Sequence, residues 1–240
     1  MNVKITISYD GSLYLGSQKQ PNKRSVEDKL MEVFNILNIE PNITLSGRTD
    51  KDVHATGQVF NIKIPSFWKD LQKLKEVLNN KLPLSIRVKS IKEVADEFHA
   101  RFHAKKRVYR YFISNKKLEP FFANYITYFK QIDEKKINEA IKLFEGVHDF
   151  EYFHKRGSGK ENLVREIYSA TFYKYKDVYV FKFEANSYLR SQMRLMVGFL
   201  LKISSGVLTK EDLKNQLDKK NYIFKVPASP YGLYLSKVKY

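Results

Sequence analysis

The stretch LSGRTDKDVHATGQVFNIKI, residues 45–64, predicts two strands joined by a turn that carries charged side chains. The Ser-Gly pair after its first residue is typical of a turn. The run at 59–64 alternates apolar and polar residues, as a half-buried strand does. On the turn, Arg48 and Asp50 lie with only Thr49 between them. The turn is therefore a candidate site, and the alternative is a surface Arg–Asp pair of little energetic value.

The turn has the residues that carboxylate chemistry needs. A carboxylate that acts as a nucleophile must be positioned and partly shielded from water. Because it follows a strand, Asp50 can point out of a sheet toward a cleft, and Arg48 can fix its rotamer by charge-assisted hydrogen bonds. Gly47 allows a tight backbone and leaves room for a substrate. The residues alone leave the catalytic site and the surface pair both open.

The segments around this turn predict the element order β-α-β-β-α-β of a ferredoxin-like unit. Alternation predicts a strand at 3–9, and Ser25 with Asp28 has the spacing of a capping box at the start of a helix. The other elements expected in this half are strands at about 43–46, 58–64 and 86–94 and a helix at about 68–80.

The second half repeats this pattern, with a strand–helix start and a later pair of strands. We expect an α+β fold of two ferredoxin-like (split βαβ) halves, residues 1–104 and 105–240. They are expected to form a continuous mixed or antiparallel sheet, with helices on one side and a basic catalytic cleft on the other. The expected elements are strands at 107–114, 166–174, 178–185 and 232–240 and helices after Asp133, at 187–204 and at 210–218.

The composition favours a polyanionic partner. The net charge is +17, which is typical of a nucleic-acid-binding protein, although a general lysine bias is the alternative because 33 of the 43 basic residues are lysine. The chain has no cysteine, which excludes disulfides and a cysteine nucleophile. No run of 18 apolar residues is present, so we expect no membrane span and a cytoplasmic location.

Two short motifs suggest chemistry that the rest of their sequence does not support. HARFH at 99–103 spaces two histidines four apart, but it leads into a strand, where they lie too far apart for one ion. GSGK at 157–160 lacks the first glycine and the hydroxyl residue of a phosphate loop, which predicts a surface loop. We expect no metal site.

Arginines gather near two further elements. In KKRVYRYF, Arg107, Tyr109 and Tyr111 share one face of a strand, which is either a platform for a stacked base or a packed core face. Arg190 and Arg194 lie one turn apart on the expected helix 187–204. That pair is either a solvated helix face or a phosphate clamp.

Five motifs in order resemble one family across nearly the whole chain. SGRTDKDVHATGQV is similar to the GRTD-x-x-VHA-x-GQV signature of TruA-type tRNA pseudouridine synthases. The other four are YDGSLYLGSQKQ at 9–20, FHARFHAKKRVYRYFI at 98–113, ANSYLRSQMRLMVG at 185–198 and GLYL at 232–235.

The resemblance implies an isomerase that converts uridine to pseudouridine at positions 38, 39 and 40 of the tRNA anticodon stem-loop, without metal or cofactor. It implies Asp50 as the nucleophile, Arg48 as the residue that pairs with Asp50 and helps to open the stem, and Tyr109 as the base-stacking residue and a candidate general base. It also implies a homodimer in which one tRNA contacts both subunits, with the dimer interface expected in 105–240. The further substrate contacts expected are Arg107, Arg110, Arg190, Arg194 and Leu233.

The chain departs from the family pattern in two places. Ser17 replaces an expected tryptophan, and Lys51–Asp52 replaces the usual Ala-Gly, which adds a carboxylate beside Asp50. The residues do not select among attack at C1′, addition to the base, and abstraction at C1′ or C2′. The alternative functions are a non-catalytic basic RNA-binding protein and a metal-free nuclease or glycosylase.

Overall fold

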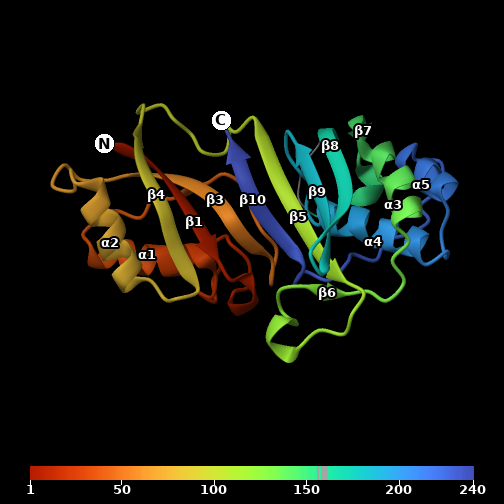
Figure 1. Ribbon diagram of the computed structural model, residues 1–240. Coiled ribbons are helices and arrows are strands. Elements are labelled where there is room, and N and C mark those ends of the chain that lie inside the picture. The colour runs from red at the N-terminus through yellow and green to blue at the C-terminus, as the bar shows by residue number, and fades with distance from the viewer. Residues whose placement is uncertain (156, 158–161) are drawn as a thin grey trace. The chain divides into compact units, whose positions relative to one another are not determined.

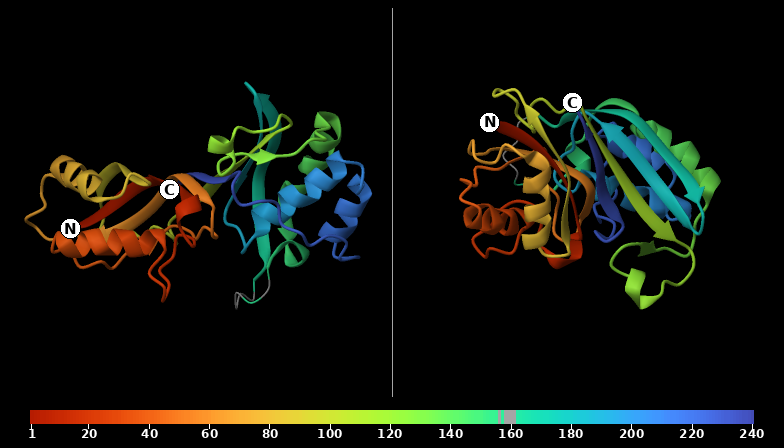
Figure 2. Two further views of the ribbon diagram at one scale, coloured as in Figure 1. Left: turned by 90° about the horizontal axis from the view of Figure 1, so that it is seen from below. Right: turned by 60° about the vertical axis from the view of Figure 1, so that its left-hand side comes forward.

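The computed structural model describes residues 1–155, 157 and 162–240. It divides into two compact units, shown in Figures 1 and 2: unit 1 is residues 1–105 with 234–240, and unit 2 is residues 106–233. The C-terminal residues therefore belong to the same unit as the N-terminal ones. Most of the GSGK stretch, residues 158–160, lies outside the described residues.

Unit 1 has the predicted β-α-β-β-α-β order. Its sheet has the order β4-β1-β3, with β1 antiparallel to both neighbours. On the other edge of β3, β2 pairs antiparallel near one end and β10 pairs parallel near the other. The elements are β1 (Asn2–Tyr9), η1 (Gly11–Leu13), α1 (Val26–Ile36), β2 (Thr44–Leu45), β3 (His54–Lys63), α2 (Leu71–Lys81), β4 (Ile86–Val94) and β10 (Leu233–Lys239).

The helices of unit 1 form where the sequence predicts them. Ser25 and Asp28 make a reciprocal capping box at the start of α1. The apolar stripe of α1 packs on the sheet, where Phe34 meets Phe60 of β3 edge to face at 6.1 Å between ring centroids. Leu74 of α2 is fully buried and fixes this helix to the core. Since such a ring pair adds about 1 kcal/mol to area burial, α1 is held firmly against the strand that follows the candidate turn.

In unit 2, the strands of the ten-stranded sheet follow the order β5-β9-β8-β7, with β6 parallel to β5. Its three α-helices gather on one face of this sheet (Figures 1 and 2). The elements are β5 (Lys106–Ser114), η2 (Pro120–Phe122), β6 (Thr127–Tyr128), α3 (Glu134–Ile141), η3 (Lys142–Phe144), β7 (Gly146–Asp149), η4 (Glu151–Phe153), β8 (Val164–Tyr175), β9 (Val178–Ala185), α4 (Gln192–Ser204) and α5 (Lys210–Leu217).

Phenylalanines build the core of unit 2. Phe144, Phe150 and Phe153 form a contiguous cluster, and Phe153 continues it to Phe199 of α4. The helix α4 is buried on nearly every side, which is why its sequence is apolar beyond a single stripe. This helix therefore forms the centre of its unit and has no broad solvated face.

The α+β fold class is confirmed, and the two largest differences from the predicted boundaries are the starts of β3 and α4. The strand β3 begins at His54, several residues before the expected start. The helix α4 begins at Gln192 instead of 187, because Ser191 has a left-handed backbone with φ 58°. In the described part of the chain, no helix is both long enough and apolar enough to cross a membrane.

Candidate active site

Thr49, the residue between Arg48 and Asp50, anchors the turn to the interior of unit 1. It is 6% exposed, and its Oγ1 lies 2.8 Å from the hydroxyl of Tyr9. Its backbone N–H donates to Oγ of Ser17 at 2.8 Å, and the Ser17 N–H donates to the Thr49 carbonyl at 3.1 Å. Thr49 is thus held at three atoms, so that its two neighbours lie on the outer side of the turn.

The buried amide of Gln58 holds the start of the same turn. Its Oε1 accepts from Ser46 Oγ at 2.7 Å, and its Nε2 donates to the Gly47 carbonyl at 2.9 Å. The Asp50 carbonyl accepts from the Val53 N–H at 3.2 Å, which closes the turn on its other side. Both ends of the segment that carries Asp50 are therefore fixed by buried polar groups of unit 1.

Arg48 and Asp50 differ in their exposure to solvent. Arg48 is exposed, whereas Asp50 is half-buried. The hydrogen bonds of Thr49 hold this segment, and the Arg48 side chain is open to solvent. The orienting role of Arg48 stays a prediction.

The additional carboxylate of the turn has a partner of its own. Asp52 Oδ2 lies 4.0 Å from Nζ of Lys51. Its backbone is left-handed, with φ 63°, a conformation that aspartate tolerates better than most residues. The two residues that replace the usual Ala-Gly of the family thus bring opposite charges that lie next to each other.

His54 is a buried residue of this region that the sequence pattern did not single out. It is 1% exposed, its Nδ1 accepts the Gly11 N–H at 3.0 Å, and its ring stacks on Tyr234 at 4.6 Å. The Asp10 Oδ1 lies 3.3 Å from the same nitrogen. Because Nδ1 accepts from a backbone N–H, we assign the ring proton to Nε2. The histidine of the VHA motif thus ties the loop after β1 to the start of β3.

Burial of Tyr9 under the turn predicts a loss of stability at high pH. Burial raises the pKa of Tyr9 to about 12, although its hydrogen bonds to Thr49, Gln58 and Ser17 oppose the shift. In the unfolded chain the pKa of tyrosine is about 10. The buried neutral hydroxyl of Tyr9 therefore makes its full contribution to the free energy of unfolding below pH 10, and this contribution is lost as pH rises toward 12. We expect wild type to lose about 2 kcal/mol more than Tyr9→Phe over this interval. Urea unfolding at pH 9 and 12 measures the difference, and parallel pH profiles for the two proteins would contradict it.

The three side chains that share a face of β5 are all buried. Arg107 Nη1 donates to the Asn186 carbonyl at 2.6 Å, and the Tyr111 hydroxyl donates to the Ser229 carbonyl at 2.8 Å. Burial raises the pKa of Tyr111 to about 12. Tyr109 is 7% exposed and meets Tyr188 edge to face at 5.1 Å. The alternatives for this face were a platform for a stacked base and a packed core face. Arg107 and Tyr111 fit the packed core face.

The predicted pair on α4 is separated in the structure. Arg190 precedes the helix and is exposed, while Arg194 is on the helix and half-buried. Arg194 Nε donates to the Ala228 carbonyl at 2.7 Å. The prediction that both arginines lie one turn apart on a solvated helix face is therefore wrong, because Ser191 interrupts the helix between them. Of the other predicted contacts, Arg110 is exposed and Leu233 is buried.

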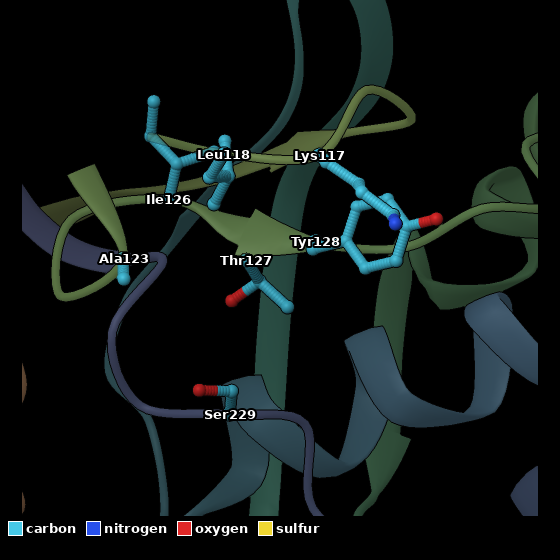
Figure 3. A pocket seen from close by; sticks show the side chains of 7 residues that line it. All are labelled: Lys117, Leu118, Ala123, Ile126, Thr127, Tyr128 and Ser229. Atoms are coloured by element: carbon cyan, nitrogen blue, oxygen red, sulfur yellow. The ribbon is translucent and has the colours of Figure 1, made fainter. Parts of the chain in front are cut away.

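A cavity of about 450 Å³ in unit 2 is lined by none of the predicted site residues. Figure 3 shows its lining, which comes from β6 and the segment that precedes it, together with Ser229. The lining residues are Lys117, Leu118, Ala123, Ile126, Thr127, Tyr128 and Ser229. Within the described residues, no group of three or more His, Asp or Glu side chains is arranged to hold a metal ion.

The predicted site residues fall into two sets. Unit 1 carries Arg48 and Asp50 on the anchored turn, and unit 2 carries the predicted arginines, Tyr109 and Leu233. Sequence reasoning missed Tyr9, Ser17 and Gln58, which hold the turn from below. The available signal was their place in the quoted motifs, with Tyr9 and Ser17 in YDGSLYLGSQKQ and Gln58 in SGRTDKDVHATGQV.

Comparison with known proteins identifies the class to which this fold and turn belong. The family model described as tRNA pseudouridine synthase matches residues 5–103 and 140–240. The chain belongs to this family. The family and enzyme class predicted from the motifs, an isomerase, are thereby confirmed.

Several relatives match over nearly their full length. A tRNA pseudouridine synthase A of Campylobacter jejuni subsp. doylei is 39% identical over 240 residues and is covered completely, as is this chain. The protein of the same name from Wolinella succinogenes is 42% identical, with 98% of this chain and 92% of the relative covered. The protein of the same name from Helicobacter pylori is 37% identical, with 99% of this chain and 98% of the relative covered.

Proposed function

We propose that this chain is a tRNA pseudouridine synthase that isomerises uridines 38, 39 and 40 of the anticodon stem-loop, with Asp50 as its nucleophile. The full-length match to relatives named tRNA pseudouridine synthase A carries the proposal. The anchored turn supports the assignment of Asp50, because a half-buried carboxylate on a fixed backbone suits covalent catalysis. Cofactors are not needed, since the reaction only rearranges bonds within one nucleotide.

The reaction breaks the N1–C1′ bond, turns the uracil and forms a C5–C1′ bond. The proton on C5 leaves, and N1 gains a proton, so atoms balance without an oxidant or a co-reactant. Asp50 attacks either C1′ or the base, or assists an abstraction at C1′ or C2′. In each case the uridine must leave its helical stack, and Tyr109 is proposed to stack against it and to serve as a general base. Arg48, which is exposed, is proposed to contact the RNA as the stem opens.

The partners proposed are tRNA and a second copy of the chain. The net charge of +17 supports binding of a polyanion. Arg107, Arg110, Arg190, Arg194 and Leu233 are proposed as further substrate contacts. Arg107 and Arg194 already donate to backbone carbonyls, so their contribution includes holding the fold of unit 2. The dimer interface is proposed to lie in 105–240, and the protein to act in the cytoplasm.

Carbodiimide labelling of substrate tRNA tests the proposed function directly. Wild-type protein is incubated with an unmodified tRNA transcript, and stable adducts are mapped by primer extension. We expect new stops at positions 38–40. Binding without adducts would support a non-catalytic RNA-binding protein instead, and strand breaks or released uracil would indicate a nuclease or a glycosylase.

Replacement of Arg190 tests the proposed phosphate contact. The side chain is exposed, so its loss leaves the fold intact. We expect Arg190→Gln to reduce the slope of log K against log salt by about 0.7–0.9 for one phosphate contact. Filter binding at several salt concentrations measures the slope. Arg190→Lys, which keeps the charge, serves as the matched control, and an unchanged slope in Arg190→Gln would exclude the contact.

A further inference from the structure

Ser17 lies where the turn that carries Asp50 meets the rest of unit 1. It is fully buried. Its Oγ accepts the Thr49 N–H at 2.8 Å, and its own N–H donates to the Thr49 carbonyl at 3.1 Å. Residues 32 positions apart in the chain are thus joined by two reciprocal hydrogen bonds. One of the two depends on the Ser17 side chain, and the other joins the two backbones.

The backbone beside Ser17 runs directly against the turn. Gly16 has φ +103°, and a Cβ built there would lie 2.9 Å from the Thr49 carbonyl oxygen and 3.5 Å from the Asp50 carbonyl carbon. Only glycine combines this backbone angle with so close an approach. The Gly16–Ser17 segment therefore supports the backbone of Asp50 itself.

The supporting segment is in turn fixed by α1. The Gly16 carbonyl accepts the Val26 N–H at 3.2 Å, and the Ser17 carbonyl accepts the Glu27 N–H at 3.0 Å. These N–H groups at the start of a helix have no partner within the helix. A continuous path of hydrogen bonds thus runs from the first turn of α1 through Ser17 to Thr49, which precedes Asp50.

We propose that Ser17 is a positioning residue for Asp50, which acts through the Thr49 N–H to fix the backbone of the catalytic turn. The inference rests on the proposed function for its catalytic consequence. Tryptophan, which the family resemblance predicts at this position, has no oxygen to accept the Thr49 N–H. The side-chain half of this anchor therefore depends on the serine of this chain.

The substitution Ser17→Ala removes the acceptor and keeps the backbone bond. Ser25→Ala is a matched control, because Ser25 is an equally buried serine that caps α1 through Asp28 and does not contact the turn. Both changes remove one buried hydroxyl from the same end of α1. A general loss of stability is common to the two variants, whereas displacement of Asp50 is specific to Ser17→Ala.

Two measurements test the proposal. In amide hydrogen exchange of the full chain, we expect Thr49 to exchange at least about tenfold faster in Ser17→Ala and within twofold of wild type in Ser25→Ala. In single-turnover reactions with excess enzyme and tRNA transcript, we expect the rate constant to fall about tenfold in Ser17→Ala, with unchanged tRNA affinity, and to stay within twofold in Ser25→Ala.

The outcomes separate the proposal from the function on which it rests. Slow Thr49 exchange in Ser17→Ala would overturn the anchor, as would a rate constant within twofold of wild type. An equal fall of the rate constant in both serine variants would reduce Ser17 to a general stabilising residue and also overturn the proposal. Wild-type protein that protects Thr49 but forms no pseudouridine would refute the proposed function and leave the anchor supported.

Discussion

Asp50→Asn is expected to abolish pseudouridine formation while tRNA binding persists. The amide has nearly the same size as the carboxylate but no negative charge, so it fits the anchored turn and cannot act as the nucleophile. We expect the rate constant to fall at least about a thousandfold, or about 4 kcal/mol of transition-state stabilisation. Tritium release from tRNA labelled at uridine C5 measures the rate. Binding should stay within about tenfold, or about 1.4 kcal/mol.

The same turn provides the control for this experiment. Asp52 is a second carboxylate two residues away, with φ 63°, and asparagine is readily accommodated in that conformation. We expect Asp52→Asn to keep the rate within about threefold of wild type, because its charge faces Lys51. Wild-type activity in Asp50→Asn would refute the assignment of the nucleophile. Equal losses in both variants would show that the charge of the turn matters more than one carboxylate.

Gly57→Ala is expected to cause a large loss of stability. A Cβ at this position of β3 would lie 2.3 Å from the Ser236 carbonyl oxygen and 3.2 Å from Lys237 Cα, both in the backbone of β10. A backbone atom cannot turn aside as a flexible side chain can, so the two strands must separate. We expect the free energy of unfolding to fall by about 3 kcal/mol or more, as measured by urea denaturation.

Gly206→Ala separates this steric cost from the cost of backbone conformation. Gly206 has φ +75° and no atom within 4 Å of an added Cβ, so only the left-handed backbone is penalised. We expect a loss of about 1 kcal/mol there. If Gly57→Ala lost no more than Gly206→Ala, the close approach of β3 and β10 would not hold in solution.

Periodicity and capping were sufficient to predict the helices and strands that have regular patterns. Strand β9 lies at the predicted residues 178–185, and the capping box of Ser25 starts α1 as expected. The start of α4 was missed because a left-handed Ser191 is a property of the backbone that residue type does not show. The partner of β10 was equally hidden, since alternation predicts that a segment is a strand but does not indicate its neighbour.

The candidate site was predicted in part. The motifs located the turn that carries Asp50, whereas the Arg48–Asp50 pair that they implied stays a prediction. The residues that hold the turn were missed because each works through hydrogen bonds to a segment that is distant in the sequence. Ser17 looked like a simple departure from the family pattern, and only its distance to Thr49 suggests a role.

The membership of β10 in unit 1 affects how the protein is made. The strand that covers one end of the β3 edge is translated after residues 1–105, and the whole of unit 2 is translated between them. While the intervening segment is being synthesised, the backbone groups of β3 near Ala55 lack the hydrogen-bond partners that β10 provides. An open strand edge is prone to pair with other chains. We therefore expect a nascent chain that stalls before residue 234 to be more prone to aggregation than the complete one.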